Sequence, residues 1–250
     1  MANIVDVTAV NVEESGFFCM RSKPKSAGYQ RKRSWLQQRF AEGLKVKMVE
    51  EDGQPKGFIE YMPIEYAWRA VLGDRYMVIH CLWIVGRGKG KGYGSKLLEA
   101  CIEDAREQDK SGVAMVSSRG TWLANKELFL KYGFQVVDEA PPAFELLVKK
   151  FREGPSPQFP GDWAERAGKY PNGITVLRSD QCPYVDQAVQ VIVETARELD
   201  VQVKVIELRD CQDARNAPSA FGVFTVMYNG ELLTYHPVTK RELLKLLHKE

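Results

Sequence analysis

A stretch of alternating glycine and basic residues, GRGKGKGYG at residues 86–94, has the chemistry needed to bind an anion. Glycine lets a ligand touch the backbone, and the N–H groups at the start of a helix favour negative charge. Arg87, Lys89 and Lys91 alternate with the glycines and add positive charge. We therefore expect the amides of this loop to hold a phosphate group, most naturally a diphosphate.

The spacing of these glycines excludes the two common phosphate-binding loops. All five fall on even positions, whereas the dinucleotide fingerprint needs two glycines three apart and the Walker loop needs two five apart. The alternative is a flexible basic loop that binds nothing or that contacts RNA. A buried strand before the loop and an amphipathic helix after it favour an ordered loop instead.

The elements around the loop indicate a layered sheet. Residues 76–85 are a continuous apolar run typical of a central strand, and residues 95–108 carry apolar side chains at helical spacing. Asp52-Gly53 predicts a hairpin turn. Further strands are expected at residues 7–11, 45–51, 113–118, 134–140 and 143–151, and further helices at 34–43 and 125–132. Antiparallel strands followed by strand–loop–helix–strand predict an α/β (α+β) fold.

Composition limits the partners of the chain. Lys+Arg 35 against Asp+Glu 33 gives no charge excess that would attract nucleic acid, and no apolar run approaches the length needed to cross a membrane. The chain starts without a signal-peptide pattern, and its five scattered cysteines fit reduced thiols in a cytoplasmic protein. Their spacing predicts no metal site.

A segment rich in proline and glycine, residues 151–172, predicts a linker. It separates a mixed first domain at residues 1–150 from a smaller second domain at residues 173–250. The smaller domain contains a βαβ pattern, a hairpin signal at Asn229-Gly230 and a closing helix.

The strand, glycine loop and helix resemble motif A of the GNAT N-acetyltransferases, in which (Gln/Arg)-x-x-Gly-x-(Gly/Ala) opens a helix. Lys89, Gly92 and Gly94 occupy these motif positions, with Lys89 in place of Gln or Arg. ANKELFLKYGFQVV, residues 124–137, resembles the following motif B. The resemblance covers roughly residues 1–150. It implies the GNAT acyl-CoA N-acyltransferase fold and transfer of an acetyl group from acetyl-CoA to a primary amine.

The resemblance also implies where acetyl-CoA lies. The pantetheine arm would follow the end of a splayed strand, the diphosphate would lie on the loop amides, and the motif B helix would flank the arm. The implied residues are Leu82, Trp83, Ile84 and Val85 for the arm, Lys89, Gly90, Lys91, Gly92, Tyr93, Gly94 and Ser95 for the diphosphate, and Asn125 and Phe129 for the flank. Phe129 is equally well explained as an ordinary core aromatic.

Acetyl transfer to an amine needs a base for the amine and an acid for the CoA thiolate. His80 and Glu60 are the candidate bases, with a hydrogen-bonded core histidine and a solvent-facing glutamate as the alternatives. Cys81 is expected on the face opposite His80. The acid is open: many family members have a motif B tyrosine where this chain has Phe129, and water, Tyr93 or a cysteine could substitute. Tyr132 lies nearby in the sequence but is adjacent to Gly133.

The C-terminal domain resembles a minimal thioredoxin fold and the YoaP-like domains found behind some GNAT domains. Cys182 lies at a helix start, where glutaredoxins carry their first active cysteine, but Val185 takes the place of the second. Pro218 matches the cis-proline position of the thioredoxin family. A disulfide reductase that needs two local thiols is therefore not expected, whereas a single reactive thiol or a structural Cys182 both fit.

Three functions follow, of which an acetyl-CoA-dependent N-acetyltransferase is the leading one. The others are a monothiol redox protein that uses Cys182 and a non-catalytic acyl-CoA-binding regulator. The acceptor, a small-molecule or peptide amine, is open, and a homodimer is compatible with the sequence. The basic segment 21–39 could receive an acidic acceptor or a CoA phosphate, or form a solvated helix face.

Overall fold

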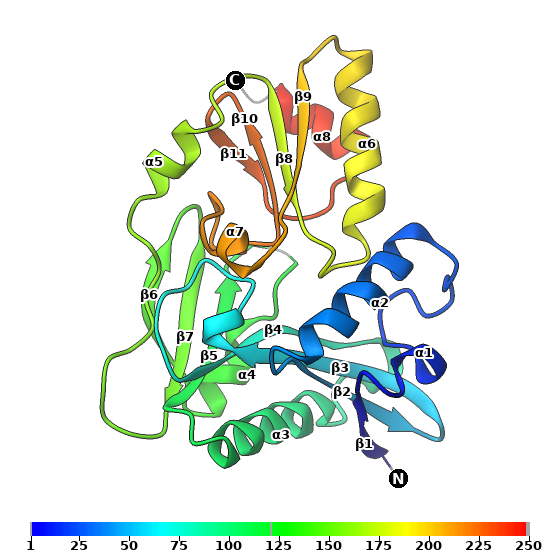
Figure 1. Ribbon diagram of the computed structural model, residues 1–250, viewed down its shortest axis with the longest axis vertical. Helices are drawn as coiled ribbons and strands as arrows, with labels where there is room; N and C mark the ends of the chain where they lie inside the picture. Colours follow the sequence, from blue (N-terminus) through cyan, green and yellow to red (C-terminus); the bar gives the residue numbers. More distant parts are fainter. Residues whose placement is uncertain (1, 121, 249–250) are drawn as a thin grey trace. The chain divides into compact units, whose positions relative to one another are not determined.

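Seven strands from the first part of the chain pair into one mixed sheet of order β1-β2-β3-β4-β5-β7-β6, as the computed structural model shows (Figure 1). The structure describes residues 2–120 and 122–248. The strands are β1 (Ala2–Val7), β2 (Lys45–Glu51), β3 (Gln54–Pro63), β4 (Tyr76–Ile84), β5 (Gly112–Ser118), β6 (Gln135–Ala140) and β7 (Phe144–Lys150). Only β4 and β5 pair in parallel. The predicted α+β fold is confirmed.

Helices and short 3-10 turns connect these strands. They are α1 (Val12–Ser15), α2 (Ala27–Phe40), η1 (Ile64–Tyr66), η2 (Gly86–Gly88), α3 (Tyr93–Glu107) and α4 (Lys126–Lys131). The α3 helix lies along one face of the sheet (Figure 1). Its apolar stripe, predicted from helical spacing, is fully or almost fully buried: Leu97, Leu98, Cys101, Ile102 and Ala105. Burying several such side chains, each worth about 1.5–3 kcal/mol, fixes α3 and the loop before it against β3, β4 and β5.

A second sheet, of order β11-β10-β8-β9, forms from the C-terminal part of the chain. Its elements are α5 (Trp163–Gly168), β8 (Ile174–Arg178), α6 (Val185–Glu198), β9 (Val203–Glu207), α7 (Cys211–Arg215), β10 (Phe224–Tyr228), β11 (Glu231–Thr234) and α8 (Lys240–Leu247). Strands β8 and β9 are parallel, and the other neighbours are antiparallel. The predicted βαβ unit, hairpin and closing helix are confirmed.

The chain divides into two compact units. The first contains residues 1–21, 33–67 and 71–159, and the second contains residues 22–32, 68–70 and 160–250. Two short segments from the first half of the sequence thus pack with the C-terminal part. The predicted domain boundaries, 1–150 and 173–250 with a linker between them, stay predictions.

Some local expectations are wrong. Residues 8–11 form a turn closed by the Val12 amide on the Thr8 carbonyl, so the first strand ends at Val7. The α2 helix begins at Ala27, because the basic residues before Trp35 continue the helix. The short helices α5 and α7 are not predicted from the sequence, because each has too few residues to show an apolar period. The peptide bond before Pro218 is trans. No helix in the described part of the chain is long and apolar enough to cross a membrane.

Candidate functional site

The glycine loop joins the end of β4 to the start of α3. Gly90 and Gly92 both have φ +78°, a left-handed conformation that L side chains rarely adopt, and Gly92 is the N-cap of α3. A Cβ built on either would meet no atom within 4 Å, so the space beside this backbone is open to a ligand. The sequence pattern placed the helix start at about Ser95, and the structure places it at Tyr93.

The amides at the start of α3 are available to an anion. The first backbone bond at this end runs from the Lys96 amide to the Gly92 carbonyl at 3.1 Å. Consequently Tyr93, Gly94 and Ser95 have no acceptor within the helix, as in every helix's first turn. These N–H groups and the helix dipole favour negative charge here. In the loop before them, the Lys89 amide donates to the Gly86 carbonyl at 3.2 Å and the Lys91 amide to the Gly88 carbonyl at 3.4 Å. The donors that fit a diphosphate are therefore those of Tyr93, Gly94 and Ser95.

Glu51, which the sequence reading missed, ties the loop to the end of β2. Its carboxylate accepts the Tyr93 hydroxyl at 2.5 Å and the Lys91 ammonium at 2.9 Å. The hydrogen bond from Tyr93 and then that from Lys91 hold the pKa of Glu51 below its ordinary value. The same contacts raise the pKa values of Lys91 and Tyr93. The Lys91 ammonium is therefore paired with Glu51.

Strands β4 and β5 separate before either ends. Their parallel pairing runs from Tyr76 opposite Gly112 to Ile79 opposite Met115, although β4 continues to Ile84 and β5 to Ser118. On its other edge β4 stays paired with β3 as far as Ile84. Among the described strands, none pairs with the β5-facing edge of Leu82–Ile84, just before the glycine loop. An extended amide-bearing chain could pair there as a strand would.

A β-bulge lies at His80. Glu60 pairs with Cys81, and Tyr61 pairs with Ile79, so His80 is the extra residue on β4. Ile79 and Leu82 both belong to the apolar cluster on the α3 face. His80 and Cys81, which lie between them, therefore both point away from the α3 face. The expectation that Cys81 faces opposite His80 is wrong, because a bulge interrupts the alternation of side chains along a strand.

His80 and Glu60 form a buried pair on the face opposite α3. Glu60 lies between Ile59 and Tyr61, which both belong to the α3-face cluster, so its side chain points away from it. The His80 Nδ1 lies 3.5 Å from the Glu60 Oε1, and the two side chains are 0% and 1% exposed. The Trp35 ring of α2 lies 6.4 Å from the imidazole. Both candidate bases thus share one site, and Glu60 is not the solvent-facing residue of the alternative reading.

The other predicted site residues lie in three environments. Trp83 and Val85 are exposed, whereas Leu82 is almost buried against the α3-face cluster and Ile84 packs against it in part. Asn125 is the N-cap of α4. These positions bound the separated end of β4 and the entry to α4.

Phe129 is fully buried and its ring contacts Phe134 at 5.4 Å. It belongs to the α3-face cluster, so the structure favours the core-aromatic explanation for its side chain. Its role beside a pantetheine arm stays a prediction.

The two tyrosines considered as proton donors both bond to carboxylates. The Tyr132 hydroxyl donates to Glu99 at 2.5 Å, and the Tyr93 hydroxyl donates to Glu51. The hydrogen bond to Glu99 raises the pKa of Tyr132. Each phenol holds its proton more tightly than a free tyrosine does, so neither gains acid strength from its surroundings.

A cavity of about 290 Å³ lies where β5 ends and α4 begins. Lys126 and Glu145 form an ion pair at 2.6 Å on its wall, and the Glu145 residue is 3% exposed. The remaining lining residues are Ser118, Arg119, Gly120, Leu123, Asn125 and Glu127. No group of histidine, cysteine and acidic residues in the described ranges could hold a metal ion.

Two family models match the chain. Residues 14–134 match the Acetyltransferase (GNAT) family, and residues 202–245 match the YoaP-like family. The chain therefore contains a GNAT acetyltransferase domain and, at its C-terminal end, a YoaP-like domain. It is an acetyltransferase whose acceptor the comparisons leave unspecified.

The chain is also similar to individual proteins. It is 29% identical to the "Uncharacterized N-acetyltransferase YoaP" of Bacillus subtilis over 98% of both chains. It is 32% identical, over 43% of this chain and 60% of the relative, to the L-methionine sulfoximine/L-methionine sulfone acetyltransferase of Salmonella typhimurium. Among solved structures, the PaiA N-acetyltransferase of Thermoplasma acidophilum in complex with coenzyme A has a TM-score of 0.45 at 13% identity, covering 60% of this chain and 99% of that one.

Proposed function

We propose that this acetyltransferase moves an acetyl group from acetyl-CoA to a primary amine of a small molecule or peptide. The observation that carries the proposal is the end of β4–β5 pairing at Ile79, directly before a loop of amides at the start of α3. A pantetheine arm has two amide groups that can pair with a strand edge, and a diphosphate needs converging N–H donors.

In this proposal Leu82–Val85 would hold the arm, and amides within Lys89–Ser95, chiefly those of Tyr93, Gly94 and Ser95, would hold the diphosphate. The open space beside Gly90 and Gly92 supports a close approach of phosphate to the backbone. Asn125 would lie beside the arm at the start of α4. Acetyl-CoA supplies an activated thioester, so the protein's remaining task is to orient and deprotonate the amine.

We assign that deprotonation to His80, with Glu60 as its positioning carboxylate. A neutral imidazole can accept a proton on one of its ring nitrogens, as a general base must. A carboxylate near Nδ1 favours the tautomer that leaves Nε2 as the proton acceptor. Burial of the pair keeps the two side chains close together and excludes water from between them.

The names of two relatives suggest which amines to test first. Two relatives that match 109 residues of this chain are named for activity on L-methionine sulfoximine and L-methionine sulfone, and on L-amino acids. Amino-acid α-amines therefore belong in the first acceptor panel, with polyamines and peptides. We also place the protein in the cytoplasm, since none of its described cysteines forms a disulfide.

The test is an assay of free CoA released from acetyl-CoA over that panel of amines. We expect at least one amine to raise CoA release well above the amine-free rate, with an acetylated product of matching mass. Titration calorimetry with acetyl-CoA provides the second measurement. Binding without release on any amine would support a non-catalytic acyl-CoA-binding regulator instead.

A further inference from the structure

The second unit contains two short segments from the first half of the sequence, residues 22–32 and 68–70. Both pack against the thioredoxin-like fold beside Cys182. They approach two of its loops, the one at residues 179–184 and the one at residues 217–222. These contacts indicate what the surface formed by the two loops binds.

Gly28, in the first turn of α2, lies directly on the cysteine loop. A Cβ built on Gly28 would stand 2.2 Å from the Pro183 carbonyl oxygen and 3.3 Å from the Asp186 Cβ. Alanine is the better helix former, so helix propensity alone disfavours glycine here. The glycine is explained by the contact, which leaves no room for a side chain.

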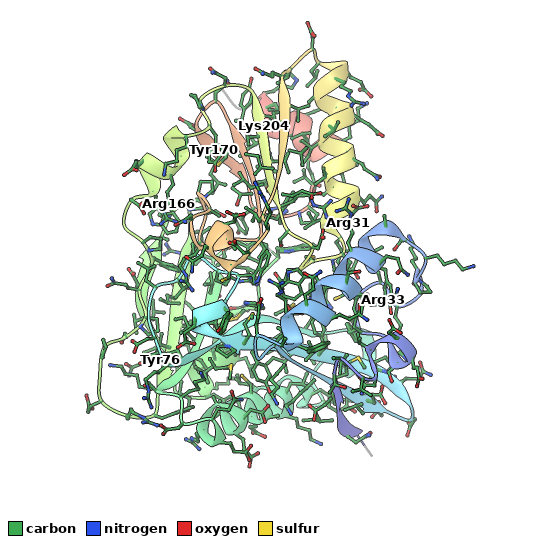
Figure 2. The ribbon with its side chains drawn as sticks, in the orientation of Figure 1. Arg31, Arg33, Tyr76, Arg166, Tyr170 and Lys204 are labelled. Carbon is green, nitrogen blue, oxygen red and sulfur yellow. The ribbon has the colours of Figure 1, made fainter. Side chains whose placement is uncertain are left out.

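Charges reinforce this contact. Arg31, labelled in Figure 2, lies 3.6 Å from Asp180, 3.5 Å from Asp186 and 3.2 Å from Glu207. The buried Arg178 holds the same two aspartates at 2.7 Å and 3.1 Å. Two arginines and three carboxylates thus join α2 to the loop that carries Cys182.

The second segment, residues 68–70, contributes a buried arginine to the contact. Arg69 is 1% exposed, donates to the Gln181 side chain at 3.2 Å, and stacks over the Phe221 ring at 4.7 Å. The Ala70 amide donates to the Ala220 carbonyl at 3.4 Å. A Cβ on Gly222 would stand 3.0 Å from the Arg69 Cα, so here too a glycine permits the close approach.

We propose that the surface around Cys182–Tyr184 and Ala217–Gly222 is a docking site for residues 22–32 and 68–70 of the same chain. Cys182 then belongs to a docking surface, which agrees with Val185 in the place of a second thiol. Further along α2, Trp35 contacts His80.

The test compares hydrogen exchange and Cys182 alkylation in full-length variants. We expect Gly28→Ala to speed both the exchange of residues 22–32 and iodoacetamide labelling of Cys182 by about tenfold, because the segment must leave the loop. Gly168→Ala is the matched control: it also adds a methyl to a helical glycine, but with no atom within 4 Å. It should stay within about twofold of wild type.

Arg31→Ala guards against a variant that fails to fold, since Arg31 is 42% exposed. We expect a few-fold faster exchange of residues 22–32, with β5 and β10 still protected. Lys240→Ala, which removes an exposed pair with Glu198 in the same unit, should leave those residues unchanged.

Wild-type rates in both Gly28→Ala and Arg31→Ala would overturn the proposal. So would rapid, reversible glutathionylation of wild-type Cys182 with residues 22–32 still protected, since that thiol would then be open to partners. Neither readout depends on acetyl transfer, so failure here is separable from failure of the proposed function.

Discussion

At the scale of single residues, the chemistry depends on the pair formed by His80 and Glu60. We expect His80→Gln to lower kcat by about 10²–10⁴-fold, the usual contribution of a general base. The glutamine fills a similar volume but cannot accept the amine proton at neutral pH. Steady-state kinetics with the best amine of the panel would measure this.

Two controls separate chemistry from folding. Acetyl-CoA affinity and the circular-dichroism spectrum should be unchanged in His80→Gln. Glu60→Gln should lower kcat less, because it alters orientation rather than removing the base. A rate within about threefold of wild type in His80→Gln would leave His80 a core histidine.

The contacts of Glu51 predict a pH dependence. Tyr93 and Lys91 hold its folded pKa below its ordinary value, so its stabilisation is fully present above the unfolded pKa and is lost as pH falls through the folded one. The difference in Tm between wild type and Glu51→Gln should therefore be present at pH 6–8 and should close as the pH falls below about 4.5. Thermal unfolding across this range measures it.

Glu153→Gln, which removes an exposed carboxylate outside the loop, is the control and should leave Tm unchanged across the same range. A Tm difference for Glu51→Gln that stayed constant down to pH 3 would mean that the Glu51 charge does not hold the loop.

At the scale of elements, the glycine loop needs its left-handed residues. Gly92→Ala should cost about 1–2 kcal/mol of stability, the penalty for a side chain at positive φ. It should also weaken acetyl-CoA binding at least tenfold, because the amides at the start of α3 would no longer converge. Calorimetry gives the affinity, and denaturant unfolding gives the stability.

The matched control is Gly53→Ala. Gly53 also has positive φ and open space, but it lies in the β2–β3 hairpin turn. We expect a similar loss of stability with normal acetyl-CoA affinity. Equal affinity in the two variants would show that the loop geometry does not serve the cofactor.

The glycine loop shows how much of the structure can be predicted from the sequence. Glycine spacing and the apolar run predicted β4, the loop and α3, because local backbone preference and periodicity determine them. The bulge at His80 was not predictable, since it shows only in the pairing of β4 with β3. Glu51 carried no signal either: its contacts to Lys91 and Tyr93 join residues 40 and 42 positions apart.

At the scale of the whole molecule, the two parts of the sequence have separable chemistry. Cys182→Ser should keep acetyl transfer within about twofold of wild type, because the candidate base and the loop amides lie on β4 and α3 and need no thiol. Loss of CoA release in Cys182→Ser, with the fold intact by circular dichroism, would make the thiol part of the reaction. It would then favour the redox hypothesis.

The central claim is that the amides beginning α3 bind the diphosphate of acetyl-CoA, and a crystal structure of the complex with CoA tests it most directly. The account predicts diphosphate oxygens about 2.7–3.2 Å from backbone nitrogens of Lys89–Ser95, with the pantetheine amides paired to β4 beyond Ile79. A diphosphate bound elsewhere, or a disordered loop with CoA present, would contradict it.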